Sequence, residues 1–223
     1  MNWTPLFLTF KLALITTILL VFVSIPIAWW LSETKSRLRP IIETLVSMPL
    51  VLPPTVLGFY FLLAFSPGNA FGAWLNDWLG IKLVFSFFGL VVASILYSLP
   101  FMVHPIQSGL ANISTSIKEA SYVMGKSKFT TLMQVMLPNI KPAMITGIVL
   151  SFAHTVGEFG VVLMIGGNIP GVTKVASIAI YDEVESMNYA SANFYSLVLF
   201  VLTFSILLIV YSFNAGYVKK FWR

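Results

Sequence analysis

Five long apolar runs constrain this chain more than any other feature of its sequence. A membrane-spanning helix needs about 20 predominantly apolar residues, and each run is of that order. The runs are Leu6–Leu31, Ile41–Phe65, Leu83–Val103, Ala143–Ile165 and Phe194–Phe213. Charged residues make up only 9% of the 223 residues, far below the roughly 25% of soluble domains. The sequence therefore predicts a single all-α integral membrane domain over residues 1–223, with about five transmembrane helices.

The second run is irregular, because it contains Pro49, Pro53, Pro54 and Gly58. Proline removes a helical hydrogen bond, so we expect this helix to be kinked or broken. A re-entrant turn or a sixth crossing stays open. The first run is too long for a cleavable signal sequence and ends on the bulky residues 29–31, so we expect it to be a retained span.

Lysine and arginine are distributed asymmetrically around these runs. Ten of the 13 fall after the first run, after the third run or in the tail: Lys35, Arg37, Arg39, Lys118, Lys126, Lys128, Lys141, Lys219, Lys220 and Arg223. The positive-inside rule places these segments in the cytoplasm. This predicts a multi-pass protein of the inner (plasma) membrane, with its N-terminus outside and its C-terminus in the cytoplasm. The net charge of +5 then reflects topology rather than nucleic-acid binding.

The composition also limits the chemistry of the chain. There is no cysteine, and His104 and His154 are the two histidines, so we expect no metal centre and no cofactor. His104, before Pro105, is expected to cap the cytoplasmic end of the third span. No serine and histidine have a recognisable catalytic spacing, so a membrane-embedded enzyme has no candidate site.

The segment between the third and fourth runs, about residues 105–141, is too elaborate for a passive connector. Ser116 and Glu119 have the spacing of a capping box, and Gly125 suits the left-handed position that ends a helix. A second short helix should end before Pro138. One face of the first helix carries Ile117, Ala120 and Met124, and one face of the second carries Phe129, Leu132, Met133 and Met136. Two short amphipathic helices around a glycine predict a docking element.

Within this segment, Ala120–Ser127 reads ASYVMGKS. It differs by one residue from the phosphate-binding loop G-x-x-x-x-G-K-S, because alanine replaces the first glycine. Such a loop follows a strand, whereas the residues before Ala120 have a helical pattern. We therefore predict no nucleotide site and no enzymatic activity in this chain. ATP hydrolysis would belong to a separate subunit.

The same segment resembles the EAA loop of permease subunits in bacterial ATP-binding-cassette (ABC) importers. The family pattern is E-A-A, three residues, G, nine residues, then I-x-L-P. Its counterparts here are Glu119, Ala120, Ser121, Gly125, Val135, Leu137 and Pro138, with Ser121 replacing alanine and Val135 replacing isoleucine. The resemblance implies that this loop forms coupling helices seated in a groove of the ATPase subunit. An apolar helix face needs such a partner groove.

Residues 157–171, followed by Thr173, Ile180 and Tyr181, resemble the permeases of molybdate importers and the related sulfate importers over essentially the whole chain. Two departures are His154, where those relatives commonly carry arginine, and residues 161–162, where they commonly carry Ala-Thr. Molybdate is the expected oxyanion, and tungstate and sulfate remain alternatives. The resemblance implies a methionine-importer-type (MetI-like) permease fold and alternating access. It also implies a homodimer in membrane lipid, with a cytoplasmic ATPase dimer and an external binding protein.

Glu158 is a carboxylate in apolar surroundings, where a bare charge is costly. His154 lies four residues earlier, so on a continuous helix the two would share a face. We therefore predict a polar pair that supports the translocation path and is no direct ligand, because a carboxylate repels a dianion. The alternative is that Glu158 lies near the outer interface and bonds only local backbone. Gly160 would allow close helix approach. Asn168 lies in a Gly- and Pro-rich segment that is either an anion-facing backbone or an ordinary turn.

A gradient-driven secondary transporter or channel is the alternative function. It would need acids inside the membrane as ion carriers, and only Glu158, with Glu43 near the end of a span, meets that need. This alternative also leaves the two-helix loop unexplained.

Overall fold

The computed structural model describes residues 2–214 and shows an all-helical chain, without strands in that range. The helices are α1 (Thr4–Glu33), α2 (Arg39–Val51), α3 (Pro54–Phe65), α4 (Ala70–Leu79), α5 (Phe87–Ala111), α6 (Thr115–Val123), α7 (Lys128–Thr131), a π-helical turn η1 (Leu132–Met136), α8 (Leu137–Asn139), α9 (Lys141–Gly157), α10 (Gly160–Gly166), α11 (Ala176–Glu185) and α12 (Tyr189–Asn214). The predicted all-α class is confirmed.

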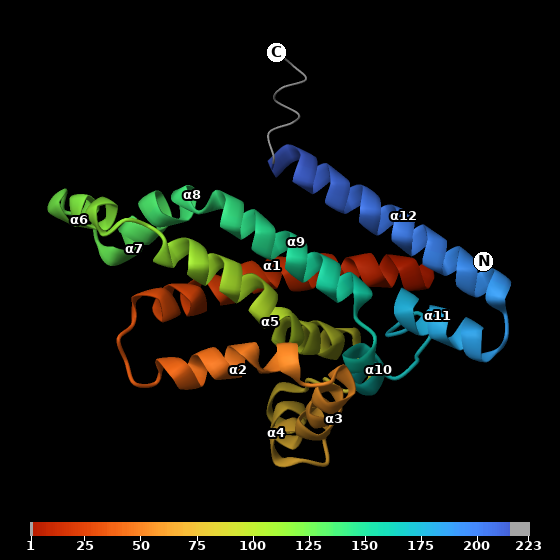
Figure 1. The fold of residues 1–223 in the computed structure, drawn as a ribbon. Helices are drawn as coiled ribbons and strands as arrows, with labels where there is room; N and C mark the ends of the chain where they lie inside the picture. The colour runs from red at the N-terminus through yellow and green to blue at the C-terminus, as the bar shows by residue number, and fades with distance from the viewer. Residues whose placement is uncertain (1, 215–223) are drawn as a thin grey trace.

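Helices α1, α5 and α9 form the centre of the bundle (Figure 1). The buried side of α1 carries several small residues, among them Ala13, Thr16, Ser24 and Ala28. Small residues let helix backbones approach closely, which is how helices associate where water supplies no hydrophobic drive. The N-terminus of α5 is fixed by Ser86, whose Oγ accepts a hydrogen bond from the Gly89 N–H at 3.0 Å.

By length and composition, α1, α5 and α12 are each able to cross a membrane, and two bent helix pairs bring the number to as many as five. One pair is α2 with α3, bent by 117°. The break lies at Leu52 and Pro53, because neither Pro53 nor Pro54 has an N–H to continue the α2 ladder. The expected break in the second run is confirmed, whereas a single straight helix over Ile41–Phe65 is not formed.

The fourth run differs from its predicted bounds. Helix α9 meets the preceding α7–α8 segment at 79° and ends at Gly157. Glu158 has extended backbone angles (φ −67°, ψ 133°), and α10 begins only at Gly160. A continuous helix over Ala143–Ile165 is therefore wrong, because the chain leaves the helical path at Glu158.

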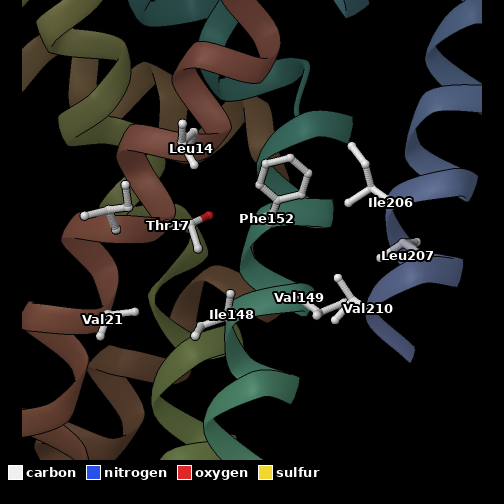
Figure 2. Close-up of a pocket in the computed structure, with 10 residues that line it drawn as sticks. Leu14, Thr17, Val21, Ile148, Val149, Phe152, Ile206, Leu207 and Val210 are labelled. Carbon is white, nitrogen blue, oxygen red and sulfur yellow. The ribbon is translucent and has the colours of Figure 1, made fainter. Parts of the chain in front are cut away.

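Helix α12 is loosely attached to this core. In the 18-residue window that qualifies it as a span, 6% of the residues are buried. A crevice of about 290 Å³ separates it from α1 and α9. Figure 2 shows that the crevice is lined by aliphatic and aromatic side chains and by Thr17.

The two ends of the bundle differ in character. Helices α6 and α7 and the turn between α1 and α2 lie at one end, and α11 lies at the other (Figure 1). The first end carries the predicted cytoplasmic basic residues up to Lys141. Lys219, Lys220 and Arg223 lie outside the described residues.

Candidate functional site

The two broken segments meet where α3 packs against α10 (Figure 1). A Cβ on Gly160 would lie 2.8 Å from the Pro54 Cβ, and a Cβ on Gly58 would lie 2.7 Å from the Met164 Cβ. Both distances are shorter than the 3.5–4.0 Å of ordinary carbon contacts. Gly160 therefore permits the close approach that its sequence context predicted.

Glu158 lies at this junction and is 5% exposed. Its Oε2 accepts a hydrogen bond from Ser94 Oγ of α5 at 2.8 Å. Its backbone carbonyl accepts another from Ser177 Oγ of α11 at 2.7 Å. Within residues 2–214, Oε1 has no hydrogen-bond partner. The residue thus fixes the α9–α10 break to two neighbouring helices, while its second carboxylate oxygen is buried without a hydrogen bond from the described residues.

His154 makes separate contacts one helical turn away. Its Nδ1 lies 2.9 Å from Ser98 Oγ of α5. Its ring stacks on Phe101, with centroids 4.1 Å apart, and packs against Tyr97 at 4.6 Å. The aromatic side chains thus hold the imidazole against α5.

The predicted pair between His154 and Glu158 is therefore wrong. Because α9 ends at Gly157, the two residues no longer occupy successive turns of one helix. Each bonds its own serine, and Ser94 and Ser98 are themselves four residues apart on α5. These two serines were missed by the sequence reasoning; their i, i+4 spacing in an apolar run was the available signal.

A cavity of about 450 Å³ opens beside these residues. It is lined by Pro54, Thr55, Tyr97, Ala153, His154, Gly157, Glu158, Phe159 and Gly160. Among the described residues no group of three metal-ligating side chains occurs. The cavity therefore combines two helix breaks, a histidine and a half-satisfied carboxylate.

The Gly- and Pro-rich segment after α10 forms a closed turn. The Ile169 carbonyl accepts hydrogen bonds from the N–H groups of Val172, Thr173 and Lys174. Thr173 Oγ1 accepts the Ile169 N–H at 3.1 Å and donates to the Gly166 carbonyl at 2.7 Å. The N–H groups of Ile169, Val172, Thr173 and Lys174 are thus used inside the turn. The structure therefore favours an ordinary turn over a backbone that faces an anion.

Asn168 connects this turn to α11. Its Nδ2 donates to Asp182 Oδ2 at 2.6 Å, and Lys174 forms an ion pair with the same carboxylate. Partial burial acts to raise the pKa of Asp182, but the hydrogen bonds from Lys174 and Asn168 outweigh it and hold that pKa below its ordinary value. In this structure Asn168 positions an outer helix and does not line the 450 Å³ cavity.

The predicted loop of about residues 105–141 is shorter in the structure, because α5 continues to Ala111 and α9 begins at Lys141. The residues between these helices fold as two helical pieces around Gly125. Gly125 has φ +78°, its N–H bonds the Tyr122 carbonyl, and the Lys126 N–H bonds the Ser121 carbonyl. These two bonds form a Schellman motif, so the predicted role of Gly125 in ending the first helix is confirmed. The hydroxyls of Ser121 and Thr131 are 2.9 Å apart and buried, which joins α6 to α7.

Three details of this segment differ from the predictions. The helix begins at Thr115, without a side-chain cap, so the Ser116–Glu119 capping box is not formed. The second piece continues through Pro138, because proline occupies the first turn of α8, where its missing N–H costs nothing. His104 lies inside α5, and its Nε2 is 3.1 Å from Ser47 Oγ of α2, so it joins two helices rather than capping one.

The loop exposes large apolar side chains. Val123, Met124 and Phe129 are 88%, 69% and 65% exposed, and Glu119 and Ala120 are also exposed. Leu137 is buried and Pro138 exposed. Several large apolar side chains exposed on one short loop indicate a contact with another protein or with lipid.

Comparison with known proteins agrees with these features. The chain is 47% identical, over 94% of each protein, to "Molybdenum transport system permease protein ModB" of Azotobacter vinelandii. It is 32% identical to "Probable sulfate transport system permease protein cysT" of Nephroselmis olivacea, over 91% of this chain and 71% of that protein. The structure of the MetNI methionine ABC transporter in inward-facing conformations matches with a TM-score of 0.73 and 16% identity, over 95% of this chain and 94% of that one. This confirms the predicted fold.

Residues 21–222 match the family described as "Binding-protein-dependent transport system inner membrane component". The match covers most of the chain, including both broken segments and the whole 105–141 loop. The chain belongs to this family of inner-membrane permease components.

Proposed function

We propose that this chain forms the membrane pathway of an ATP-driven molybdate importer, as one half of a homodimer. The observation that carries the proposal is the α6–α8 loop, which projects from one end of the bundle with an exposed apolar surface. A loop that is bound rigidly to its own helices can transmit a movement of the ATPase to the membrane-spanning helices, whereas a flexible connector would not. Here the Ser121–Thr131 hydrogen bond and the Lys118–Glu33 ion pair provide that rigidity.

The partner at this surface is a cytoplasmic ATPase subunit. Glu119, Ala120, Ser121, Gly125, Leu137 and Pro138 are assigned to the coupling element. The exposed Val123 and Met124 would enter the ATPase groove, because apolar helix faces bind in apolar grooves. Closure of an ATPase dimer would then pull two such loops together and tilt the helices joined to them.

A second copy of the chain would complete the pathway. The described residues of one copy supply at most five spans, and a two-fold pair would create a pathway at its axis. We place His154, Glu158, Gly160 and Asn168 along or beside this pathway as supporting residues. Glu158 would hold the break between α9 and α10 rather than bind the anion, because a carboxylate repels an oxyanion.

The orientation follows from the charge of the bundle's ends. The end with Lys35, Arg37 and Lys118 would be cytoplasmic, and α11 would face the external binding protein. The substrate would enter from that protein when the pathway opens outward. Molybdate is favoured because the relative at 47% identity is named a molybdenum permease. Sulfate is the second candidate because a relative at 32% identity is named for it; tungstate, a closely similar oxyanion, stays an alternative.

The test compares two glycines in similar backbone conformations. Gly125 and Gly80 both have positive φ, +78° and +65°, and a Cβ on either would meet no atom within 4 Å. Valine is strained at positive φ at both sites, but only Gly125 lies in the proposed coupling loop. We expect Gly125→Val to abolish co-purification of the ATPase and molybdate uptake into proteoliposomes that contain the whole transporter.

The control and the competing substrates complete the design. Gly80→Val should insert normally and retain ATPase binding. Equal loss in both variants, or no loss in Gly125→Val, would show that the loop is not the coupling element. Uptake of labelled molybdate should persist in excess sulfate; if sulfate abolishes it, the substrate assignment is wrong.

A further inference from the structure

A second pocket lies at the predicted cytoplasmic end of α1, far from the 450 Å³ cavity. It has a volume of about 330 Å³ and is lined by Trp29, Trp30, Glu33, Thr34, Tyr122 and Lys128. Trp29, Trp30 and Glu33 belong to the end of α1, and Thr34 follows it directly. Tyr122 and Lys128 belong to α6 and α7. The pocket thus joins a membrane-spanning helix to the loop.

The charge that this pocket offers is positive. Glu33 is neutralised by its ion pair with Lys118. Lys128 forms no ion pair within the described part of the chain. An anion entering the pocket would therefore meet one uncompensated ammonium group beside three aromatic rings.

An exposed apolar stripe on α1 leads directly to this pocket. Leu14, Ile18, Phe22, Pro26 and Trp30 follow one another at intervals of four residues, and all are exposed. Neighbouring members of this row lie side by side, and the row winds around the helix by about 40° for each step of four residues, so that Leu14 and Ile18 reach the crevice beside α9 and α12. From Leu14 to Trp30 the stripe rises by about 24 Å, at about 1.5 Å per residue, which exceeds the roughly 15 Å of one leaflet's hydrocarbon.

We propose that this pocket binds the head group of an anionic phospholipid of the cytoplasmic leaflet. The phosphate would lie on Lys128, and the acyl chains would follow the stripe past Phe22 and Ile18. Tryptophan and tyrosine concentrate at the level of the head groups, and basic pockets between helices on the cytoplasmic side bind anionic head groups. A soluble phosphate would use the lysine but not the stripe, so the occupant is a lipid.

The site has a consequence for the transporter. Tyr122 and Lys128 are carried by the coupling loop, so a bound lipid would fasten that loop to the bilayer. This inference rests on the orientation given under Proposed function, but its test measures lipid binding and not transport.

The experiment uses the full chain purified in detergent and native mass spectrometry of bound lipid. We expect phosphatidylglycerol to bind in preference to phosphatidylcholine. We expect Lys128→Gln to weaken phosphatidylglycerol binding by about fivefold, which is the factor that the attraction of one lysine to an anionic head group contributes to the binding constant. Lys128→Arg should retain binding because it keeps the charge. Lys35→Gln, which removes an exposed charge outside the pocket, should have no effect.

Four outcomes would overturn the proposal. Equal binding of the two lipids would remove the need for a cation. Equal weakening by Lys35→Gln would indicate a diffuse surface charge instead of a site. Displacement of the lipid by millimolar inorganic phosphate, with the same dependence on Lys128, would show that the pocket takes a soluble anion. Loss of ATPase binding in Lys128→Gln with unchanged lipid binding would assign the pocket to the ATPase contact and would leave the transport proposal intact.

Discussion

Two glycines three residues apart should respond differently to replacement by alanine. Gly160 begins α10, and a Cβ built on it would lie 2.8 Å from the Pro54 Cβ and 3.3 Å from the Thr55 N. The Pro54 ring is fixed to the backbone, so the clash is relieved only if α3 and α10 move apart. Gly157, near the end of α9, meets no atom within 4 Å.

The expected magnitudes follow from these contacts. Overpacking a close contact costs about 1–3 kcal/mol, so Gly160→Ala should destabilise the fold by about 2 kcal/mol. Glycine in a helix is less favourable than alanine by roughly 0.5–1 kcal/mol, so Gly157→Ala should be neutral or slightly stabilising. For a chain of this size, 1 kcal/mol corresponds to about 2–4 °C in the thermal midpoint. Gly160→Ala should therefore lower the midpoint by about 4–8 °C, and Gly157→Ala should raise it by at most about 4 °C.

The assay is thermal unfolding of the full chain in detergent, followed by molybdate uptake in the reconstituted transporter. Gly58→Ala is an independent replicate, because its Cβ would lie 2.7 Å from the Met164 Cβ across the same helix crossing. We expect Gly160→Ala and Gly58→Ala to reduce both stability and uptake. A midpoint for Gly160→Ala equal to or above that of the unmodified chain would refute the close packing of α3 on α10. Equal destabilisation by Gly157→Ala would show that glycine flexibility, and not contact distance, is what matters.

Two further predictions concern single interactions. Ser94→Ala should destabilise the chain by about 1.5–3 kcal/mol, because it removes the hydrogen bond to the buried Glu158 carboxylate. In the double variant Ser94→Ala/Glu158→Leu, the loss of stability measured by unfolding in detergent should be smaller than the sum of the two single losses. Full additivity would contradict the contact. The stabilisation that Asp182 contributes should be present above its unfolded-state pKa and be lost as pH falls through its lower folded-state pKa. Amide hydrogen exchange of residues 166–186 should therefore accelerate as the pH falls through that acidic window. The acceleration should be smaller in Lys174→Gln, and an equal acceleration in the two proteins would refute the role of the ion pair.

Local chemistry was sufficient to predict several elements. The apolar runs identified the long helices α1, α5 and α12, because a span requires a continuous apolar stretch and little else. The ends of α1 were predicted to within two residues, whereas α5 continues eight residues beyond the predicted Val103. The prolines predicted the break between α2 and α3. Gly125 was predicted at the end of a helix because a left-handed position favours glycine, whatever the rest of the fold.

Predictions that required knowledge of neighbouring helices were less successful. The capping box failed because Ser116 already lies inside α6, one residue beyond its start. Glu158 and His154 have helical spacing in the sequence, but hydrogen bonds from Ser94 and Ser177 hold Glu158 where α9 ends. The residue pattern of one segment cannot predict a hydrogen bond to a hydroxyl group on another segment.

The sequence by itself determined the membrane class, the long helices and the asymmetric distribution of charge, because these depend on the transfer of residues between water and hydrocarbon. The tertiary structure decided where helices break and which polar groups pair. It brought Pro54 against Gly160, gave Glu158 and His154 separate serines, and left the end of α1 beside Lys128. The physical reason is that a buried polar group must find a partner across the bundle, and that partner is set by helix packing, which is not encoded in any single segment.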